Sequence, residues 1–200
     1  MTDTERPQPL AVALAALALL IATAPPALAH TGEGVAGGFL AGLRHPVLGP
    51  DHVIAMVAVG LWGAFLGRSA IWVLPIVFPL VMAVGGALGV VGVPIPEVET
   101  GIALSAVLLG LAVAAAFRPP IWVAAVLVGA FAIFHGHAHG TELPQAANSV
   151  AYSAGFVIST GLLHLAGIAF GLLAARPLGA LAVRGAGALI AAGGVYFLAA

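Results

Sequence analysis

HPVLGPDH, residues 45–52, is the stretch that decides the fold, because it places a break and several polar side chains directly before a long apolar run. Proline lacks the N–H that an interior helical position requires, so Pro46 and Pro50, together with Gly49, favour an interruption of the helix here. Interrupted backbone at membrane depth is tolerated only where it lines a cavity or is buried in protein. The stretch therefore predicts a broken or re-entrant segment, in which a short hydrophobic piece (35–43) precedes the first span.

The composition of the chain requires lipid as its solvent. Of its 200 residues 62% are hydrophobic and only 6% are charged, whereas soluble domains are about 25% charged. A soluble chain of this length could not bury so much apolar surface. We therefore predict an all-α fold, a polytopic transmembrane helical bundle that forms one domain over 30–200. Because a span needs about 20 apolar residues, we expect about six spans: 51–67, 70–92, 98–117, 121–139, 150–175 and 178–198.

The N-terminus has the layout of a cleavable signal peptide, which we assign to residues 1–29. An apolar run (10–21) is followed by Pro25-Pro26, which breaks a helix, and then by an A-x-A site that ends at Ala29. An uncleaved first span is the alternative. Cleavage after Ala29 would make His30 the mature N-terminus, where its amine and imidazole could bind one metal ion.

The charged residues between the expected spans predict the orientation. Cytoplasmic loops of membrane proteins carry an excess of Lys and Arg. With the mature N-terminus outside, the cytoplasmic ends of the spans carry Arg68, Arg118, Arg176 and Arg184, and the external loops carry Glu97, Glu99 and Glu142. Only Arg44 departs from this pattern. We therefore expect both ends of the mature chain outside.

Glycines four residues apart recur in several expected spans. Such spacing lets helix backbones approach closely in lipid. The pairs are Gly63/Gly67, Gly85/Gly89, Gly136/Gly140 and Gly167/Gly171.

Polar side chains within spans are costly, and so they indicate function. In the first motif, His45 and His52 are candidate metal ligands. Asp51 is a candidate ligand too, although a carboxylate at the start of a helix could instead cap it. The second motif is FHGHAHGTE, residues 134–142.

The spacing of the second motif is typical of metal ligands. His135 and His139 are i, i+4 and share one helical face. Glu142 follows near that face. His137 points elsewhere, and we expect it to face solvent, so it is a weaker candidate.

Two further candidates come from other spans. His164 lies deep in the fifth expected span, and Thr160, one turn earlier, could orient its ring. Ser105 in the third span is a weaker candidate ligand. The depth of each group follows from counting about 1.5 Å per residue from the cytoplasmic end of its helix. All of them fall between the middle of the membrane and its outer face. From the outer face inward the order is Glu142, His139, His135 with His52, and then His164.

The set of ligands limits which metal the chain could handle. The chain has seven His and no Cys. Imidazole with carboxylate suits Ni, Co, Zn or Fe(II) better than Cu(I), and Mg and Ca prefer oxygen ligands throughout. Ligands staged by depth are typical of a transport path.

The two motifs resemble the HupE/UreJ family of nickel/cobalt permease-type membrane proteins. Two weaker matches support the resemblance: the stretch from Glu99 through Gly101 to Ser105, and the Thr160…His164 pair. The resemblance implies a permease of the bacterial cytoplasmic (inner) membrane that takes up nickel, or cobalt, for hydrogenase or urease. It also implies that six residues bind the metal: His45, Asp51, His52, His135, His139 and Glu142.

We expect no tightly bound cofactor, because the metal ion is the transported substrate. The partners we expect are that ion, the lipid bilayer, and a homo-oligomer or a metal-delivery protein. A net charge of −1 gives no indication of a nucleic-acid partner. Two alternatives remain: an intramembrane metal-dependent hydrolase, which would need one closed site with an activated water, and a metal-binding membrane subunit without transport.

Overall fold

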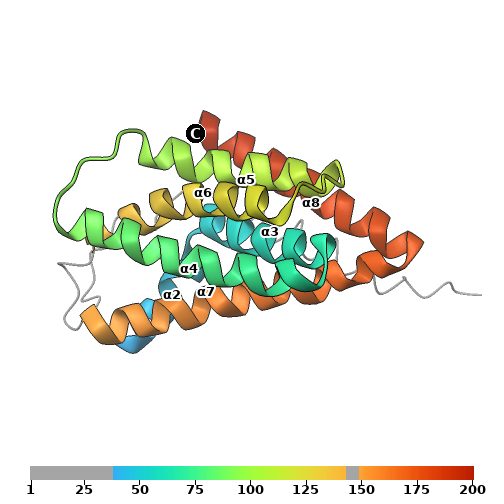
Figure 1. Ribbon diagram of the computed structural model, residues 1–200. Helices are drawn as coiled ribbons and strands as arrows, with labels where there is room; N and C mark the ends of the chain where they lie inside the picture. The colour runs from blue at the N-terminus through green and yellow to red at the C-terminus, as the bar shows by residue number, and fades with distance from the viewer. Residues whose placement is uncertain (1–37, 143–148) are drawn as a thin grey trace, which may run out of the picture.

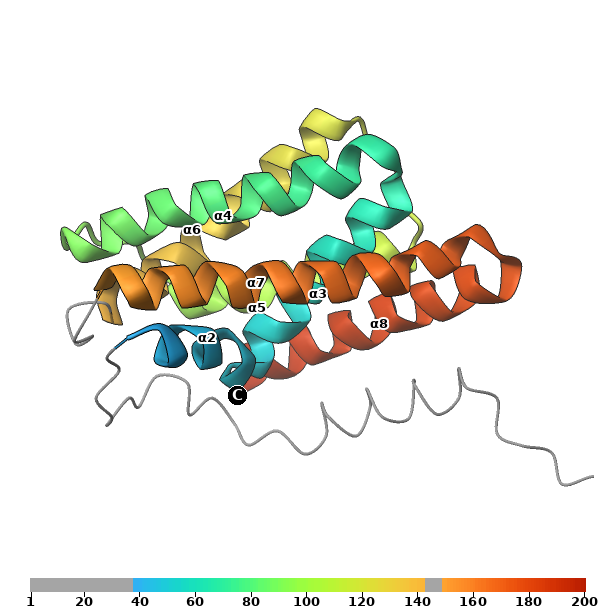
Figure 2. The same cartoon turned by 90° about the horizontal axis from the view of Figure 1, so that it is seen from below.

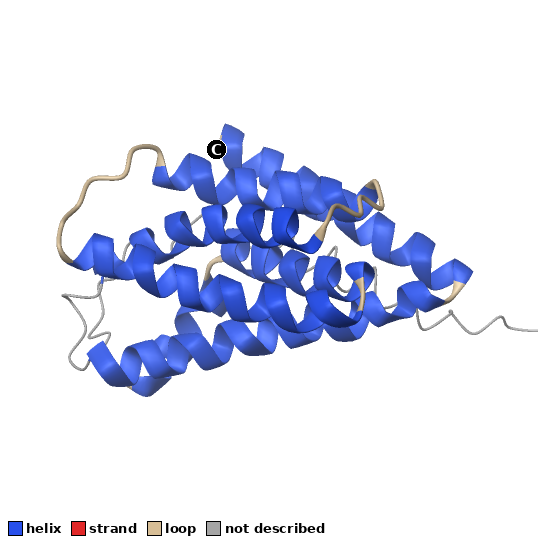
Figure 3. Cartoon of the chain, in the orientation of Figure 1, coloured by secondary structure: helices blue, strands red, loops and turns tan. Residues whose placement is uncertain are grey.

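The structure, a computed structural model, describes residues 38–142 and 149–200, and within these ranges it contains helices and connections only (Figures 1 and 3). The predicted signal peptide and His30 lie outside the described residues. The helices are α2 (Phe39–Leu48), α3 (Pro50–Leu66), α4 (Arg68–Val90), α5 (Val98–Ala114), α6 (Ile121–Glu142), α7 (Ser149–Gly171) and α8 (Pro177–Ala199), with a 3-10 turn at Leu172–Ala175.

Close backbone packing joins the helices in pairs. α4 packs along α6, α5 along α8, and α3 along α7, and α2 lies against the first half of α7. Figure 2 shows α4 and α6 together along one side of the bundle, with α2 and α8 on the other side. Glycine makes the close approach between α4 and α6 possible, because a Cβ at Gly136 would overlap the Met82 carbonyl, and one at Gly85 would overlap the Ile133 carbonyl.

The lengths of the helices agree with a membrane bundle. α4, α6, α7 and α8 are each long and apolar enough to cross a bilayer, and α2 with α3 forms a fifth apolar unit bent by 85°. α5 has 17 residues, about 26 Å at 1.5 Å per residue, against a hydrocarbon core of about 30 Å. The prediction of an all-helical bundle whose first span is preceded by a broken segment is confirmed. That α5 supplies a sixth span stays a prediction.

The break in the first segment is shorter than we expected. We placed it at both His45-Pro46 and Gly49-Pro50, but α2 continues through Pro46 and ends at Leu48. Pro46 lies in the last turn of a ten-residue helix, so its missing N–H removes only one helical hydrogen bond. The bend occurs at Gly49, which is extended (φ −96°, ψ 100°), and Pro50 then takes the first position of α3, where its missing N–H removes no helical bond.

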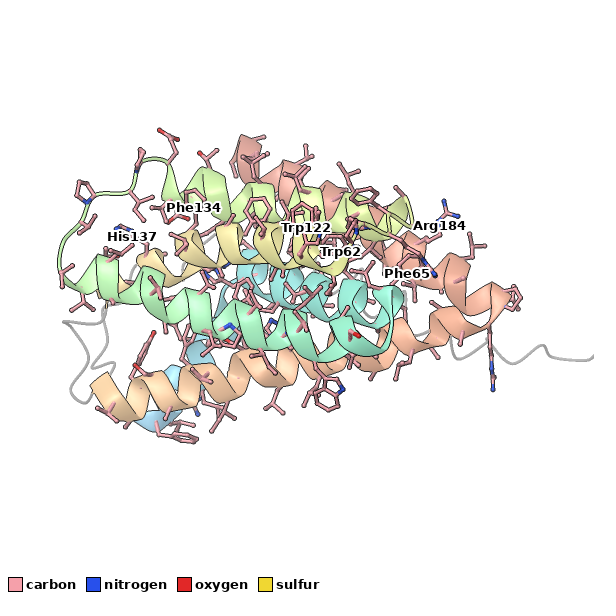
Figure 4. All side chains as sticks on the ribbon, viewed as in Figure 1. Trp62, Phe65, Trp122, Phe134, His137 and Arg184 are labelled. Atoms are coloured by element: carbon pink, nitrogen blue, oxygen red, sulfur yellow. The ribbon has the colours of Figure 1, made fainter. Side chains whose placement is uncertain are left out.

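The two ends of the bundle carry opposite charges. At the end where α5 joins α6, the Arg118 guanidinium lies 4.5 Å from the centre of the Phe65 ring, and Arg184 Nε donates to the Ala114 carbonyl at 2.8 Å. Figure 4 shows Phe65 and Arg184 toward this end and His137 near the opposite one. Glu97, Glu99 and Glu142 belong to the helix ends on the His137 side.

Candidate metal-binding site

Four imidazoles form an unbroken row in the interior of the bundle, and they come from three helices. The ring centres are 4.8 Å apart for His45 and His139, 4.6 Å for His139 and His52, and 4.8 Å for His52 and His135. His45 is on α2, His52 is on α3, and the other two are on α6. The bend at Gly49 turns His52 inward at the first turn of α3 while His45 stays on α2. The two sequence motifs are therefore brought together.

The outer end of this row carries a carboxylate. Glu142 Oε2 lies 3.2 Å from His45 Nε2 and 3.9 Å from His139 Nδ1. One ligand atom from each of these three residues can be chosen so that all lie within 4.8 Å of one another, a spacing that could hold a metal ion. Glu142 is in the last turn of α6, where the partial negative charge of the helix end disfavours a carboxylate. A cation between Glu142 and the two imidazoles would offset that cost.

Asp51 lies in the first turn of α3 and orients the His52 ring. Its Oδ1 lies 3.1 Å from His52 Nδ1, and both side chains are nearly fully buried. The N-cap of α3 is Gly49, which has no side chain to cap the helix. The Asp51 carboxylate in the first turn also accepts from the backbone N–H of His52, so the capping alternative for Asp51 stands beside its contact with the His52 ring. A carboxylate that accepts from one ring nitrogen fixes the tautomer and leaves the other nitrogen to bind a metal.

His135 is held in a similar way by a hydroxyl. Its Nε2 lies 2.9 Å from Ser105 Oγ on α5, and the same hydroxyl donates to the Ile102 carbonyl at 2.6 Å. Because that hydroxyl already donates to the carbonyl, His135 Nε2 is the donor to Ser105, and Nδ1 is the nitrogen available to a ligand. Ser105, a weaker candidate ligand in the sequence, thus positions a ring.

His137 is buried and lies apart from the row, contrary to our expectation that it faces solvent. Only 7% of its surface is exposed. Its Nε2 donates to the Val93 carbonyl at 2.7 Å, so it ties α6 to the connection between α4 and α5 (Figure 4). The helical-face argument separated His137 from His135 and His139 correctly, but the connection that covers His137 could not be read from periodicity.

His164 is also apart from the row. Its imidazole is 1% exposed, and its ring centre lies 5.4 Å from that of Phe78, which in turn lies 5.4 Å from His135. Thr160 does not orient this ring as we expected, because its hydroxyl has no hydrogen-bond partner in the described part of the chain.

Aromatic residues that sequence reasoning missed enclose the row. The Phe156 ring packs on His139 at 4.3 Å, and the Tyr152 ring packs on His45 at 5.7 Å. Both come from α7, one turn apart. The chain contains only two Tyr, and a Tyr near the outer end of a span that faces the His motifs was a signal that could have indicated Tyr152.

An apolar cavity of about 340 Å³ lies where α4, α6 and α7 meet. His139, Tyr152 and Phe156 belong to its wall, and Met82 and Val90 line the α4 side. His139 is thus a member of the imidazole row that also borders an apolar cavity.

The fold and the site together define a class: a multi-pass helical membrane protein whose interior holds clustered imidazoles and carboxylates able to bind a metal ion. The chain belongs to the HupE/UreJ family, since the family model described as "HupE / UreJ protein" matches residues 17–197. Among curated proteins, Protein HupE of Rhizobium leguminosarum bv. viciae is 50% identical over 155 residues, which cover 77% of this chain and 81% of that protein. No solved structure matches the chain.

Proposed function

We propose that the chain is a permease for a divalent transition-metal ion, nickel or cobalt, in the bacterial cytoplasmic membrane. The observation that carries this proposal is the unbroken row of four imidazoles inside an apolar helical bundle, with Glu142 at its outer end. The family is associated with nickel and cobalt transport for hydrogenase or urease, which agrees with the donor set. Neutral imidazoles with carboxylates and no thiolate suit these metals.

The ligands support transport through their arrangement as well as their type. Glu142 and His45, whose side chains are 26% and 18% exposed, form the part of the site that an ion outside would reach first. His139 and His52 follow, and His135 lies deepest of the four. A row in which each step is short and no single place supplies a complete ligand shell allows an ion to be passed on, because binding must be weak enough for release.

The same arrangement disfavours the hydrolase alternative. A catalytic metal site needs about three protein ligands that converge on one ion and an open position for water. In the described ranges His45, His139 and Glu142 converge in this way, but His52 and His135 continue the row inward from them, and a single catalytic site has no use for this continuation. In the proposed orientation Glu142 lies outside and the Arg-rich end lies in the cytoplasm, so the carboxylate is at the end that an external ion meets, which favours uptake as the direction.

Uptake of radioactive nickel and cobalt by cells that express the chain tests this proposal. We expect His52→Ala and His135→Ala each to abolish accumulation while the protein still reaches the membrane. His137→Ala is the matched control, because His137 bonds a backbone carbonyl outside the row. This variant should retain most of the uptake. Accumulation that persists in both variants would contradict the site, and a loss as severe in His137→Ala would contradict the separation of that residue from it.

A further inference from the structure

His164 and Thr160 on α7 are polar groups that the imidazole row does not use. Each is 1% exposed, and neither the two ring nitrogens of His164 nor the Thr160 hydroxyl has a hydrogen-bond partner in the described ranges 38–142 and 149–200. Buried polar side-chain atoms almost always have a partner, so three such atoms on neighbouring side chains require a reason. An ion that accepts one lone pair from the imidazole and one from the hydroxyl would account for two of these atoms.

The Phe78 ring joins His164 to the inner end of the imidazole row through ring contacts. Phe78 is fully buried, and its ring packs against both His135 and His164 in T-shaped contacts, with ring centres 5.4 Å from each. Consecutive imidazoles within the row lie 4.6–4.8 Å apart with no side chain between them. The sequence suggested a single series from Glu142 to His164, whereas in the structure the ring contacts that lead from His135 to His164 pass through Phe78.

The position of His164 is fixed by the helix beside it. A Cβ at Gly60 would overlap the His164 carbonyl, so the α3 backbone lies directly against α7 at this turn. Thr160 and His164 are i, i+4, and their side chains share one face of α7. An imidazole and a hydroxyl therefore lie on one face of α7, from its middle to the turn that follows.

We propose that His164 and Thr160 form a second binding station for the divalent metal ion, distinct from the cluster of His45, His139 and Glu142. The inference rests on the proposed function. An imidazole nitrogen and a hydroxyl oxygen supply two ligands, so the ion keeps part of its water shell and is bound more weakly than at the outer cluster. A weak station beyond a tighter one favours onward release.

Metal stoichiometry tests the second station. The full chain is purified in lipid nanodiscs, and bound radioactive nickel is measured by equilibrium dialysis over a wide concentration range. We expect two ions per wild-type chain, one held more weakly. His164→Ala should lose the weaker ion and keep the tighter one, and Thr160→Val should lower the affinity of the weaker ion only. Ser159→Ala removes a neighbouring buried hydroxyl and should leave both ions in place.

Each other outcome has a definite meaning. Two ions retained in His164→Ala would overturn the second station and leave the proposed transport intact. The same conclusion would follow if wild type binds one ion that His139→Ala removes and His164→Ala does not. A folded wild-type chain that binds neither nickel nor cobalt would overturn both proposals. If His164→Ala does not fold, His164→Gln replaces it in the test, because glutamine keeps a polar side chain of similar volume. His164→Gln should then lose the weaker ion.

Discussion

Glu142 is the residue at which the charge of a helix end bears on the proposed metal binding. It is half-buried, it lies in the last turn of α6, and its carboxylate is close to His45 and His139. Without a cation, the carboxylate is disfavoured by the helix end. In the proposed metal cluster it is the ligand that contributes negative charge, which would favour a dication over a neutral solute.

We predict that Glu142→Gln lowers nickel affinity at the tighter site by about tenfold or more, equivalent to about 1.4 kcal/mol, because the amide keeps the shape and loses the charge. Isothermal titration of the purified protein measures the change. Glu97→Gln is the control, since Glu97 is exposed at the same end of the bundle and accepts a hydrogen bond from Thr100. Equal losses in both variants would indicate a general surface-charge effect and contradict the specific role of Glu142.

The residues of the site could be predicted because they occur in two short motifs, whereas the groups that orient and enclose them could not. Helical spacing placed His135 and His139 on one face, and the first motif predicted a break in the helix close to His45 and His52. Hydrogen bonds such as that from His135 to Ser105 join residues 30 positions apart. Periodicity within one helix carries no information about such contacts.

At the scale of the helices, glycine determines how closely the site-bearing elements pack. Gly136 and Gly140 bring α6 against α4, where a Cβ at either would overlap a carbonyl, of Met82 or of Gly86. The glycine pairs in the sequence correctly indicated close packing at these positions. Gly67 has a different role, because it lies in the turn between α3 and α4 with φ +108°.

We predict that Gly136→Ala destabilises the bundle by about 1–3 kcal/mol, the usual cost of overpacking, and shifts the two flanking imidazole-bearing turns of α6. Gly161→Ala is the matched control, since a Cβ there meets nothing within 4 Å. Thermal unfolding in detergent, followed by the loss of monodisperse protein, gives the comparison. Equal melting temperatures for the two variants would contradict the packing of α4 against α6.

At the scale of the whole molecule, the ends of the bundle differ in charge, and this asymmetry predicts how the chain lies in the membrane. The Arg-rich end carries Arg118, Arg176 and Arg184, and the other end carries Glu97, Glu99 and Glu142. The positive-inside rule requires only the order of spans and charges along the chain, which is why the sequence was sufficient to predict an orientation. The cavity beside His139 depends on how three helices meet in space, and the order of residues along the chain does not indicate it.

The absence of Cys from the chain allows a direct test of orientation with single cysteines. Val91→Cys and Leu178→Cys place exposed thiols at opposite ends, since these side chains are 71% and 78% exposed. We predict that a membrane-impermeant maleimide labels Val91→Cys in intact spheroplasts and labels Leu178→Cys only after the membrane is permeabilised. The reverse pattern would place the Glu142 end in the cytoplasm.

Metal flux through the purified protein tests the central claim most directly. Wild type and His139→Ala are reconstituted into lipid vesicles that contain a metal-sensitive fluorescent dye, and nickel or cobalt is added outside. His139 joins His45, His52 and Glu142, so its removal interrupts the row. The account predicts dye quenching with wild type and none above protein-free vesicles with His139→Ala. Equal flux through both would contradict the row as the path, and no flux through wild type that binds metal would instead support a metal-binding subunit.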